Sequence, residues 1–301
     1  MYNKKKNLYL VRMTVPKNFH QIWVGPNPLP PAQNSIVKNN FKILGPSWNL
    51  KLWTNDDLTE CNFPRTWKYI QKSLKVGKKR GKIYWAQISD LMRYEILYHH
   101  GGIYMDVTMQ IMKNLDPMIT YANKNKKELI VSHQEKNYDW WGKCSELSCR
   151  TVYWPDESKE NKFKLIPHTS NSFIGTMRHS KPMERLTNEK KLKTIDFNSH
   201  RVDVFTGPVY LRSSFKKSKS VWFIPTEKIY PFDWGEAVGA CDNNNIFLKN
   251  SADKCISRIK SKNYNVPALN QRKERIWLSV PCNKYLKAWA IKHWDIGGTW
   301  K

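Results

Sequence analysis

Residues 84–112 of this chain read YWAQISDLMRYEILYHHGGIYMDVTMQIM, and this stretch decides the fold. Its first half places apolar side chains at helical spacing, which predicts a helix that ends at the histidine pair. The double glycine at 101–102 follows, and glycine accepts the left-handed backbone that closes a helix. Residues 103–105 are apolar and β-prone and predict a buried strand. Asp106 would then stand just beyond a strand end, where open α/β sheets place their ligands.

The segments around this stretch predict further strands and helices. We expect strands over 15–25, 48–53, 109–112, 128–132 and 221–224, and helices over 33–44, from 181–182 and from 206–208. A strand, helix, strand, helix order at the start of a chain is typical of a βαβ sheet. Asp56 and Asp57 occupy positions where a helix cap is wanted. The basic segment 75–82 is interpreted as a loop, and 115–117 as a turn, because they contain glycine or proline.

The length and composition indicate one large globular domain. A chain of 301 residues can bury a substantial core. It is 40% hydrophobic and 13% aromatic and contains 14 tryptophans, whereas disordered chains are poor in aromatic residues. We expect a basic N-terminal arm over 1–14 and a single domain over 15–301. Residues 135–165, polar and rich in aromatic side chains, are interpreted as an insertion or a long loop.

The net charge of +26 is large, and the basic residues are dispersed along the chain. Such a field attracts nucleotides, anionic membrane surfaces, acidic glycans and nucleic acid alike, and it selects none of them. Solvated lysines on an ordinary surface account for the charge equally well. A nucleic-acid-binding protein would gather lysine and arginine on one element. No nucleic-acid motif is present either, so we expect no nucleic-acid partner.

Cysteine usage and hydropathy favour a cytoplasmic protein. The six cysteines show neither the paired spacing of a zinc site nor the density of a small disulfide scaffold, so reduced thiols are expected. No run approaches the roughly 20 apolar residues that cross a bilayer. The apolar core near the start, residues 8–11, is too short for a signal peptide.

The order of residues within 84–112 resembles the sugar-binding region of the DxD-type glycosyltransferases, glycosyltransferase family 32. Asp and Arg one helical turn apart, a double glycine, a strand and an aspartate occur in the fixed order typical of this family. Its members include enzymes like the yeast initiating mannosyltransferase, and clostridial glucosylating toxins are distantly similar. The resemblance implies a GT-A-like, Rossmann-like α/β fold and a retaining transfer from a nucleotide-sugar donor. Residues 285–301 would then form a C-terminal lid over the donor.

The resemblance also implies roles for individual residues. Catalytic roles fall to Asp90, Arg93 and Asp106. Donor binding falls to Gln21, Trp23, Ser89, Tyr104, Asn171, Thr299 and Trp300. Bland alternatives stay open from the residues alone: a surface ion pair for Asp90 and Arg93, a core side chain for Trp23, and a strand-end turn for Asn171.

A divalent metal is expected beside Asp106, because Mn²⁺ and Mg²⁺ prefer oxygen ligands and bridge phosphates. The family usually has a second acid two residues later, but this chain has Thr108, a neutral and poorer ligand. Three outcomes are open. His293 or Asp295 completes the metal site, lysines replace the metal, or the enzyme is inactive.

The expected partners are a UDP- or GDP-sugar donor and a glycan, protein or lipid acceptor, with an anionic membrane surface as a further option. Two alternatives remain. One is a degenerate GT-A protein that binds or hydrolyses the donor without efficient transfer. The other is a basic nucleic-acid-binding protein, whose binding would be sensitive to salt.

Overall fold

The structure is a computed structural model of the chain, and it describes residues 14–133, 169–199, 201–215, 219–230 and 288–292. It also describes the backbone of an antiparallel pair of strands, β8 (Tyr264–Leu269) and β9 (Arg275–Val280). The predicted arm, except for residue 14, the predicted insertion at 135–165, and all of the predicted lid except 288–292 lie outside the described residues.

The centre of the fold is a six-stranded sheet with the order β2-β1-β3-β6-β5-β7. Its strands are β1 (Asn18–Ile22), β2 (Asn49–Trp53), β3 (Gly102–Met105), β5 (Leu129–His133), β6 (Thr169–Thr176) and β7 (Val221–Ile224). Five of these six strands run in one direction, and β6 runs against them. The predicted strands at the start of the chain are thus confirmed as a parallel pair flanking a helix.

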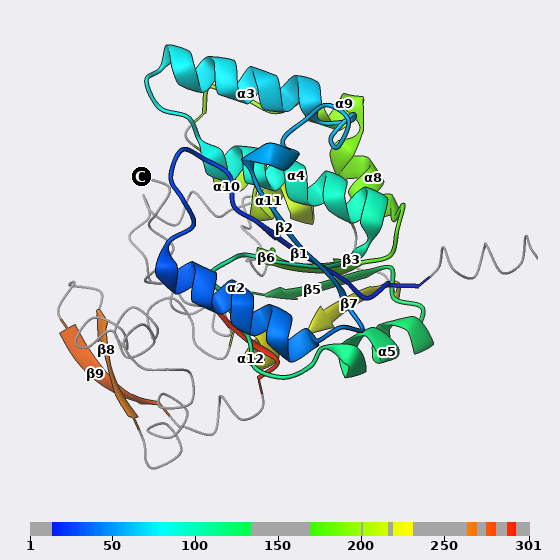
Figure 1. Cartoon of the computed structure of the whole chain (residues 1–301), viewed down its shortest axis with the longest axis vertical. Coiled ribbons are helices and arrows are strands. Elements are labelled where there is room, and N and C mark those ends of the chain that lie inside the picture. The colour runs from blue at the N-terminus through cyan, green and yellow to red at the C-terminus, as the bar shows by residue number, and fades with distance from the viewer. Residues whose placement is uncertain are drawn as a thin grey trace, which may run out of the picture.

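Helices cover both faces of this sheet (Figure 1). One face carries α2 (Pro31–Leu44), α5 (Asp116–Lys124) and α12 (Thr226–Ile229). The other carries α3 (Trp67–Lys79), α4 (Trp85–His100), α8 (Lys181–Thr187), α9 (Glu189–Leu192), α10 (Val202–Phe205) and α11 (Pro208–Arg212). Side chains of the strands alternate between two apolar cores, one under each layer. This is the predicted α/β fold.

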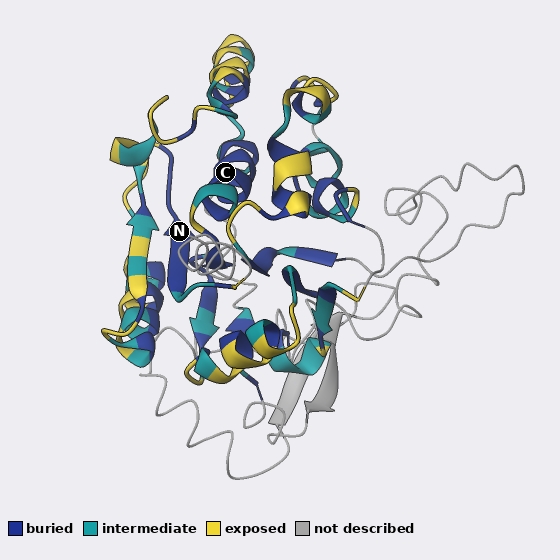
Figure 2. Ribbon diagram, turned by 90° about the vertical axis from the view of Figure 1, so that its right-hand side faces the viewer, coloured by how far each residue is buried: buried dark blue, intermediate teal, exposed yellow. Residues whose placement is uncertain are grey.

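The helix α4 is the most buried helix of the fold, and the double glycine fixes how it leads into β3. Every residue from Gln87 to Leu97 is buried. Figure 2 shows in dark blue the buried helix and strand segments at the centre of the fold. Gly101 closes the helix with φ at +59°. Gly102 has φ at +96°, and a Cβ atom there would lie 2.2 Å from the carbonyl oxygen of Asn18 in β1. Only glycine fits at 102, so the predicted helix stop is confirmed.

Two local predictions were wrong. Residues 75–79 belong to α3 and not to a loop. Gly77 does not break the helix. A Cβ atom there would lie 2.7 Å from the Cα atom of Ile83, so this glycine permits close packing inside a helix. Asp116 and Pro117 open α5 and do not form a turn, because proline is tolerated in the first turn of a helix.

Asp57 has the capping role that the sequence predicted. Asp57 accepts a hydrogen bond from the backbone N–H of Thr54 at 2.9 Å and so caps the 3₁₀ turn Asn55–Asp57.

The strand β4 (Met109–Ile111) lies outside the central sheet and pairs with β10 (Ala290–Lys292), in antiparallel register with Lys292 opposite Met109. This pairing brings the end of the described chain beside the strand ends of the sheet. None of the helices in the described ranges has both the length and the hydropathy of a membrane span.

Candidate active site

Three strands bring their functional residues together at one edge of the central sheet. Parallel strands end at the same edge, so Trp23 after β1 and Asp106 after β3 lie on the same side. The strand β6 runs in the opposite direction, and Asn171 near its start therefore lies at that edge too. The backbone N–H of Asp106 donates to the carbonyl oxygen of Ser172 at 3.0 Å, which ties the two strands together there.

A cavity of about 240 Å³ opens at this edge. Its walls contain most of the residues predicted from the sequence, namely Trp23, Ser89, Asp90, Arg93, Tyr104, Asp106, Thr108 and Asn171. Gln21 stands behind the cavity, where its Nε2 atom donates to the carbonyl oxygen of Asp106 at 3.2 Å. Outside the described residues lie the predicted tail residues His293, Asp295, Thr299 and Trp300.

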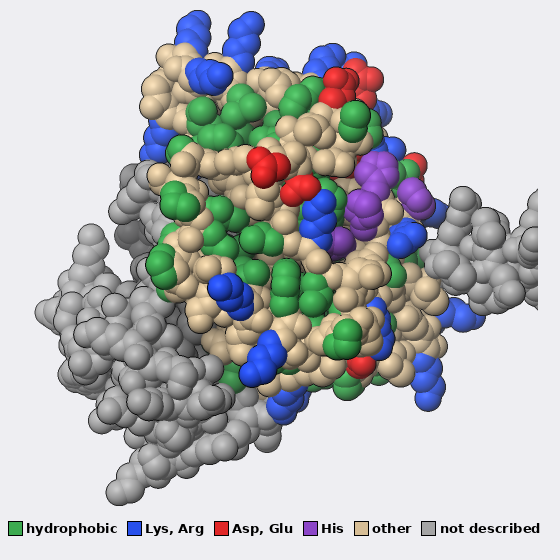
Figure 3. Space-filling model, in the orientation of Figure 1, with side chains coloured by type: hydrophobic (Ala, Val, Ile, Leu, Met, Phe, Trp, Pro, Cys, Tyr) green, Lys and Arg blue, Asp and Glu red, His purple; other side chains and the backbone are tan. Residues whose placement is uncertain are grey.

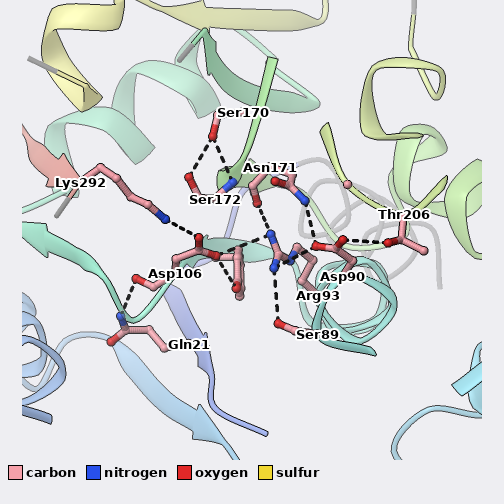
Figure 4. A network of polar contacts seen from close by, with 12 residues as sticks. Gln21, Ser89, Asp90, Arg93, Asp106, Ser170, Asn171, Ser172, Thr206 and Lys292 are labelled. Atoms are coloured by element: carbon pink, nitrogen blue, oxygen red, sulfur yellow. Dashed lines mark hydrogen bonds and ion pairs between the residues drawn. The ribbon is translucent and has the colours of Figure 1, made fainter. Parts of the chain in front are cut away.

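Arg93 on α4 is the centre of the polar network (Figure 4). Its Nη2 atom lies 3.0 Å from Oδ1 of Asp90, and its Nη1 atom lies 3.6 Å from Oδ1 of Asp106. Nη1 also donates to the carbonyl oxygen of Asn171 at 2.6 Å. The side chains of Asp90 and Arg93 are only 5% and 7% exposed. The alternative interpretation of Asp90 and Arg93 as a surface ion pair is therefore wrong, since the pair is buried.

Asp90 is surrounded by hydrogen-bond donors. Its Oδ1 atom accepts from Nδ2 of Asn171 at 2.9 Å, and its Oδ2 atom accepts from the hydroxyl of Thr206 at 2.9 Å. Burial raises the pKa of Asp90 to about 6, although Arg93 and the bond from Thr206 act in the opposite direction. The carboxylate is therefore ionised at neutral pH and becomes neutral in mild acid.

Asp106 lies between two cations. Its Oδ1 atom accepts from the hydroxyl of Tyr104 at 2.8 Å, and its Oδ2 atom accepts from Nζ of Lys292 at 2.6 Å. Burial alone would raise the pKa of Asp106, but Lys292 and Arg93 outweigh it, and the pKa lies below its usual value. Asp106 is therefore an anion at neutral pH, with both oxygens engaged.

The described residues do not fit a divalent metal in this arrangement. Both oxygens of Asp106 already accept hydrogen bonds, and Lys292 stands at Oδ2. Within the ranges that the structure describes, the hydroxyl oxygen of Thr108 is buried without a hydrogen bond. No group of three or more histidine, cysteine, aspartate or glutamate residues is close enough to hold a metal within those ranges. The described side chains of the cavity wall therefore do not form a binding site for the expected Mn²⁺ or Mg²⁺.

Trp23 belongs both to the core and to the cavity wall. The side chain is only 8% exposed and packs with Val37 and Val107. Its Nε1 atom donates to the carbonyl oxygen of Asn27 at 2.9 Å, which fixes the orientation of the ring. The core reading of Trp23 is thus correct as far as packing goes, and the expected contact with a donor base stays a prediction.

Sequence reasoning missed three polar residues of this site. Lys292 reaches Asp106 from the end of the described chain, and no local pattern pointed to it. Thr206 belongs to a segment that was singled out as a helix start, but its hydrogen bond to Asp90 was not expected. Asp203 lines the cavity from α10, where Arg201 holds it in an ion pair at 2.9 Å.

Comparisons with known proteins match part of the chain to glycosyltransferases. Residues 31–126 match the family model described as "Glycosyltransferase sugar-binding region containing DXD motif". Over 102 residues the chain is 36% identical to the uncharacterized glycosyltransferase L373 of Acanthamoeba polyphaga mimivirus, covering 34% of this chain and 38% of that protein. Over 112 residues it is 30% identical to inositol phosphoceramide mannosyltransferase 1 of Schizosaccharomyces pombe, covering 36% of this chain and 32% of that protein.

The match spans about a third of the length of these relatives. Among solved structures, the PaToxG glycosyltransferase aligns over 70% of this chain and 75% of its own chain, with a TM-score of 0.44 and 13% identity. The matched region 31–126 contains Asp90, Arg93 and Asp106, the residues that carry the resemblance. The predicted resemblance is therefore confirmed over this part of the chain: residues 31–126 match the sugar-binding region of the DXD-type glycosyltransferases.

Proposed function

We propose that this chain is a glycosyltransferase that moves a sugar from a nucleotide-sugar donor to a hydroxyl of an acceptor. One observation carries the proposal: the buried pair of Asp90 and Arg93 meets Asp106 in a cavity at the strand ends of the sheet. Buried charges are costly and persist where a function uses them. A cavity lined by acids and a guanidinium at this edge suits a ligand that combines hydroxyl groups with negative charge.

Asp90 and Arg93 bind the hydroxyl groups of the donor sugar in this proposal. Each carboxylate oxygen offers two lone pairs, and Oδ2 of Asp90 accepts one hydrogen bond, from Thr206. It therefore keeps capacity for a sugar hydroxyl. Asn171 positions Asp90, because its side chain donates to Oδ1 while its carbonyl oxygen accepts from Arg93.

The leaving diphosphate needs positive charge near it. Lys292 and Arg93 are cations on the cavity wall, and both lie against Asp106. Charge-assisted hydrogen bonds from such groups to phosphate oxygens are among the strong ones. Asp106 holds the two cations in position and binds the ribose of the donor. Trp23, at the end of β1, lies beside the donor base.

We further propose that the configuration at the anomeric carbon is retained. The acceptor hydroxyl attacks on the face from which the diphosphate leaves, and a leaving-group oxygen removes its proton. Within the described part of the cavity wall, Asp90 and Asp106 are each committed to hydrogen bonds with neighbouring donors. In this proposal the two carboxylates bind and position the donor, and neither attacks the anomeric carbon.

The acceptor carries a free hydroxyl on a glycan, a protein or a lipid. A relative named as an inositol phosphoceramide mannosyltransferase makes inositol-bearing lipids the first acceptors to test, with GDP-mannose as the first donor. Figure 3 shows lysine and arginine side chains spread over one face of the described residues. In a nucleic-acid-binding surface they would instead be gathered in a patch or along one element. The cavity, and not the overall charge, therefore defines the proposed function.

Thermal shift against UDP- and GDP-sugars tests donor binding, because a ligand that binds only the folded state raises the melting temperature. We expect one nucleotide sugar to stabilise the protein, and Asp90→Asn to remove the effect. Asp116→Asn is the matched control, since Asp116 pairs with Lys17 and does not line the cavity. Donor stabilisation and hydrolysis without transfer to any acceptor would favour the degenerate alternative. The anomeric signal of the product in NMR tests retention.

A further inference from the structure

We propose that Lys292 takes the place of the divalent cation at Asp106, so that the nucleotide-sugar donor binds without a metal. This inference rests on the proposed function, because it concerns how the same cavity neutralises the donor diphosphate. It concerns a residue that the sequence pattern did not single out.

The ammonium group of Lys292 occupies the position that a metal would take. Its Nζ atom lies 2.6 Å from Oδ2 of Asp106, and the side chain of Lys292 is only 12% exposed. A divalent cation bound by this carboxylate would need the same oxygen at about 2.0–2.6 Å. The other oxygen, Oδ1, accepts from Tyr104 at 2.8 Å and faces Arg93 at 3.6 Å. The ammonium therefore stands where the metal would bind.

The charges around Asp106 balance without a metal. In a DxD site, two carboxylates and one divalent cation sum to zero charge. Here Thr108 replaces the second acid. Asp106 with Lys292 sums to zero charge, and so does Asp90 with Arg93. The loss of an acid at 108 and the presence of a lysine at 292 thus compensate each other.

The sheet pairing holds the lysine in place. Lys292 belongs to β10, which pairs with β4 so that Lys292 lies opposite Met109. Its strand neighbours Ala290 and Ile291 are buried, with 0% and 3% exposure. The backbone register, and not a mobile surface position, places the ammonium against Asp106. An ammonium group has three N–H donors, so one group can bridge Asp106 and a phosphate oxygen.

The test uses the full chain, freed of metal with EDTA and then titrated in two separate experiments. Mn²⁺ alone is titrated and followed by electron paramagnetic resonance, and a panel of UDP- and GDP-sugars is titrated by calorimetry with and without Mn²⁺. We expect no Mn²⁺ bound through Asp106 and the same donor affinity in both conditions. Mn²⁺ bound to the wild type and lost in Asp106→Asn, or donor binding only with Mn²⁺, would overturn the inference.

Variants of Lys292 separate charge from packing. Lys292→Met should weaken donor binding at least about tenfold, as expected for the loss of a charge-assisted contact. Lys292→Arg keeps the positive charge and should retain most of the affinity. Lys17→Met is the control, because it breaks an ion pair of 2.9 Å with Asp116, a residue that does not line the cavity. Lys292→Met with unchanged donor affinity contradicts the inference.

Failure of the proposed function looks different from failure of the inference. If no nucleotide sugar binds the wild type with or without Mn²⁺, the transferase proposal fails, and with it the claim of metal-free donor binding. If a donor binds but needs Mn²⁺, the transferase proposal stands and the role of Lys292 is wrong.

Discussion

The Nζ atom of Lys292 lies 2.6 Å from Oδ2 of Asp106, although 186 positions separate the two residues in the chain. The pairing of β10 with β4 makes this contact possible, because β4 begins shortly after Asp106. Arg93 approaches the other carboxylate oxygen at 3.6 Å. One anion is therefore held between two cations that come from distant parts of the sequence, and the cavity is built around this arrangement.

Arg93→Met should destabilise the fold strongly. The substitution leaves the buried Asp90 and the half-buried Asp106 near each other without the guanidinium that lies between them. Removing one partner of a buried ion pair costs roughly 3–5 kcal/mol, because the remaining charge is uncompensated. Urea unfolding of the two proteins measures the difference.

Arg201→Met is the control for that experiment. Arg201 also forms an ion pair at 2.9 Å, with Asp203, but the two side chains are 39% and 45% exposed. Exposed pairs contribute less than about 1 kcal/mol. An equal loss in both variants would mean that the buried network around Arg93 carries no special stability.

Donor affinity should fall as the pH drops through about 6, the pKa to which burial raises Asp90. Protonation removes the negative charge that holds Arg93 and accepts from sugar hydroxyls. The diphosphate of a nucleotide sugar does not titrate in this range, so the change reports on the protein. Calorimetric titration of the donor across this window measures it, and the control Asp116→Asn, which changes a residue outside the cavity, should show the same pH dependence. A flat profile for the wild type contradicts the assignment.

The effect of Asp90 on stability has the opposite sign. Its pKa in the folded protein, about 6, lies above the ordinary value of 3.8, so the folded state binds this proton more tightly. The contribution is therefore fully present below the ordinary value and is lost as the pH rises through about 6. Between these values, acid strengthens this contribution to stability while it weakens donor binding.

Two threonines of the site should respond differently to removal of their hydroxyl groups. Thr206→Val deletes the donor to Oδ2 of Asp90 and should cost roughly 1.5–3 kcal/mol, as for a bond to a charged group. Thr108→Val deletes a buried hydroxyl that makes no hydrogen bond with the described residues, so stability should be unchanged or higher. Unfolding free energies of both variants check this. A large loss in Thr108→Val would reveal a partner for that hydroxyl.

Local signals in the sequence predicted the centre of the fold correctly. The apolar spacing of α4, the double glycine and the short strand β3 are all encoded within 84–112, so they could be read without knowledge of the rest. The helix α3 was missed although its buried residues Tyr69, Ile70, Ser73 and Gly77 follow a helical spacing. The lysines and the glycine in the last turns of α3 favoured the interpretation of this segment as a loop.

Contacts between distant segments could not be predicted in the same way. The resemblance predicted that residues 285–301 lie over the donor, but no local signal indicates that Lys292 contacts Asp106, because the contact depends on the pairing of β10 with β4. Thr206 was noticed only as the start of a helix, and its bond to Asp90 follows from how α11 packs near α4. The sequence predicted which residue types the site contains, whereas the partners of each depend on tertiary packing.

Gly102→Ala should destabilise the protein by roughly 3 kcal/mol or more, since overpacking and a positive φ both oppose a side chain. The new Cβ atom would lie 2.2 Å from the carbonyl oxygen of Asn18, at φ +96°. Gly45→Ala is the control: its φ is +70°, but nothing lies within 4 Å of the added atom. That variant should lose only about 1–3 kcal/mol of stability, from backbone strain alone. Equal losses in thermal or urea unfolding would contradict the close approach of β3 to β1.

The most direct test of the central claim measures release of nucleoside diphosphate from UDP- and GDP-sugars by the wild type and by Asp106→Asn, with Asp116→Asn as the control. Asp106 holds Lys292 and Arg93 in the cavity, whereas Asp116 pairs with Lys17 and does not line it. We predict turnover of one donor by the wild type and by Asp116→Asn, and its loss in Asp106→Asn with the fold intact. Unchanged turnover in Asp106→Asn would contradict the account. So would a wild type that turns over no nucleotide sugar but binds RNA or DNA tightly and in a salt-sensitive way.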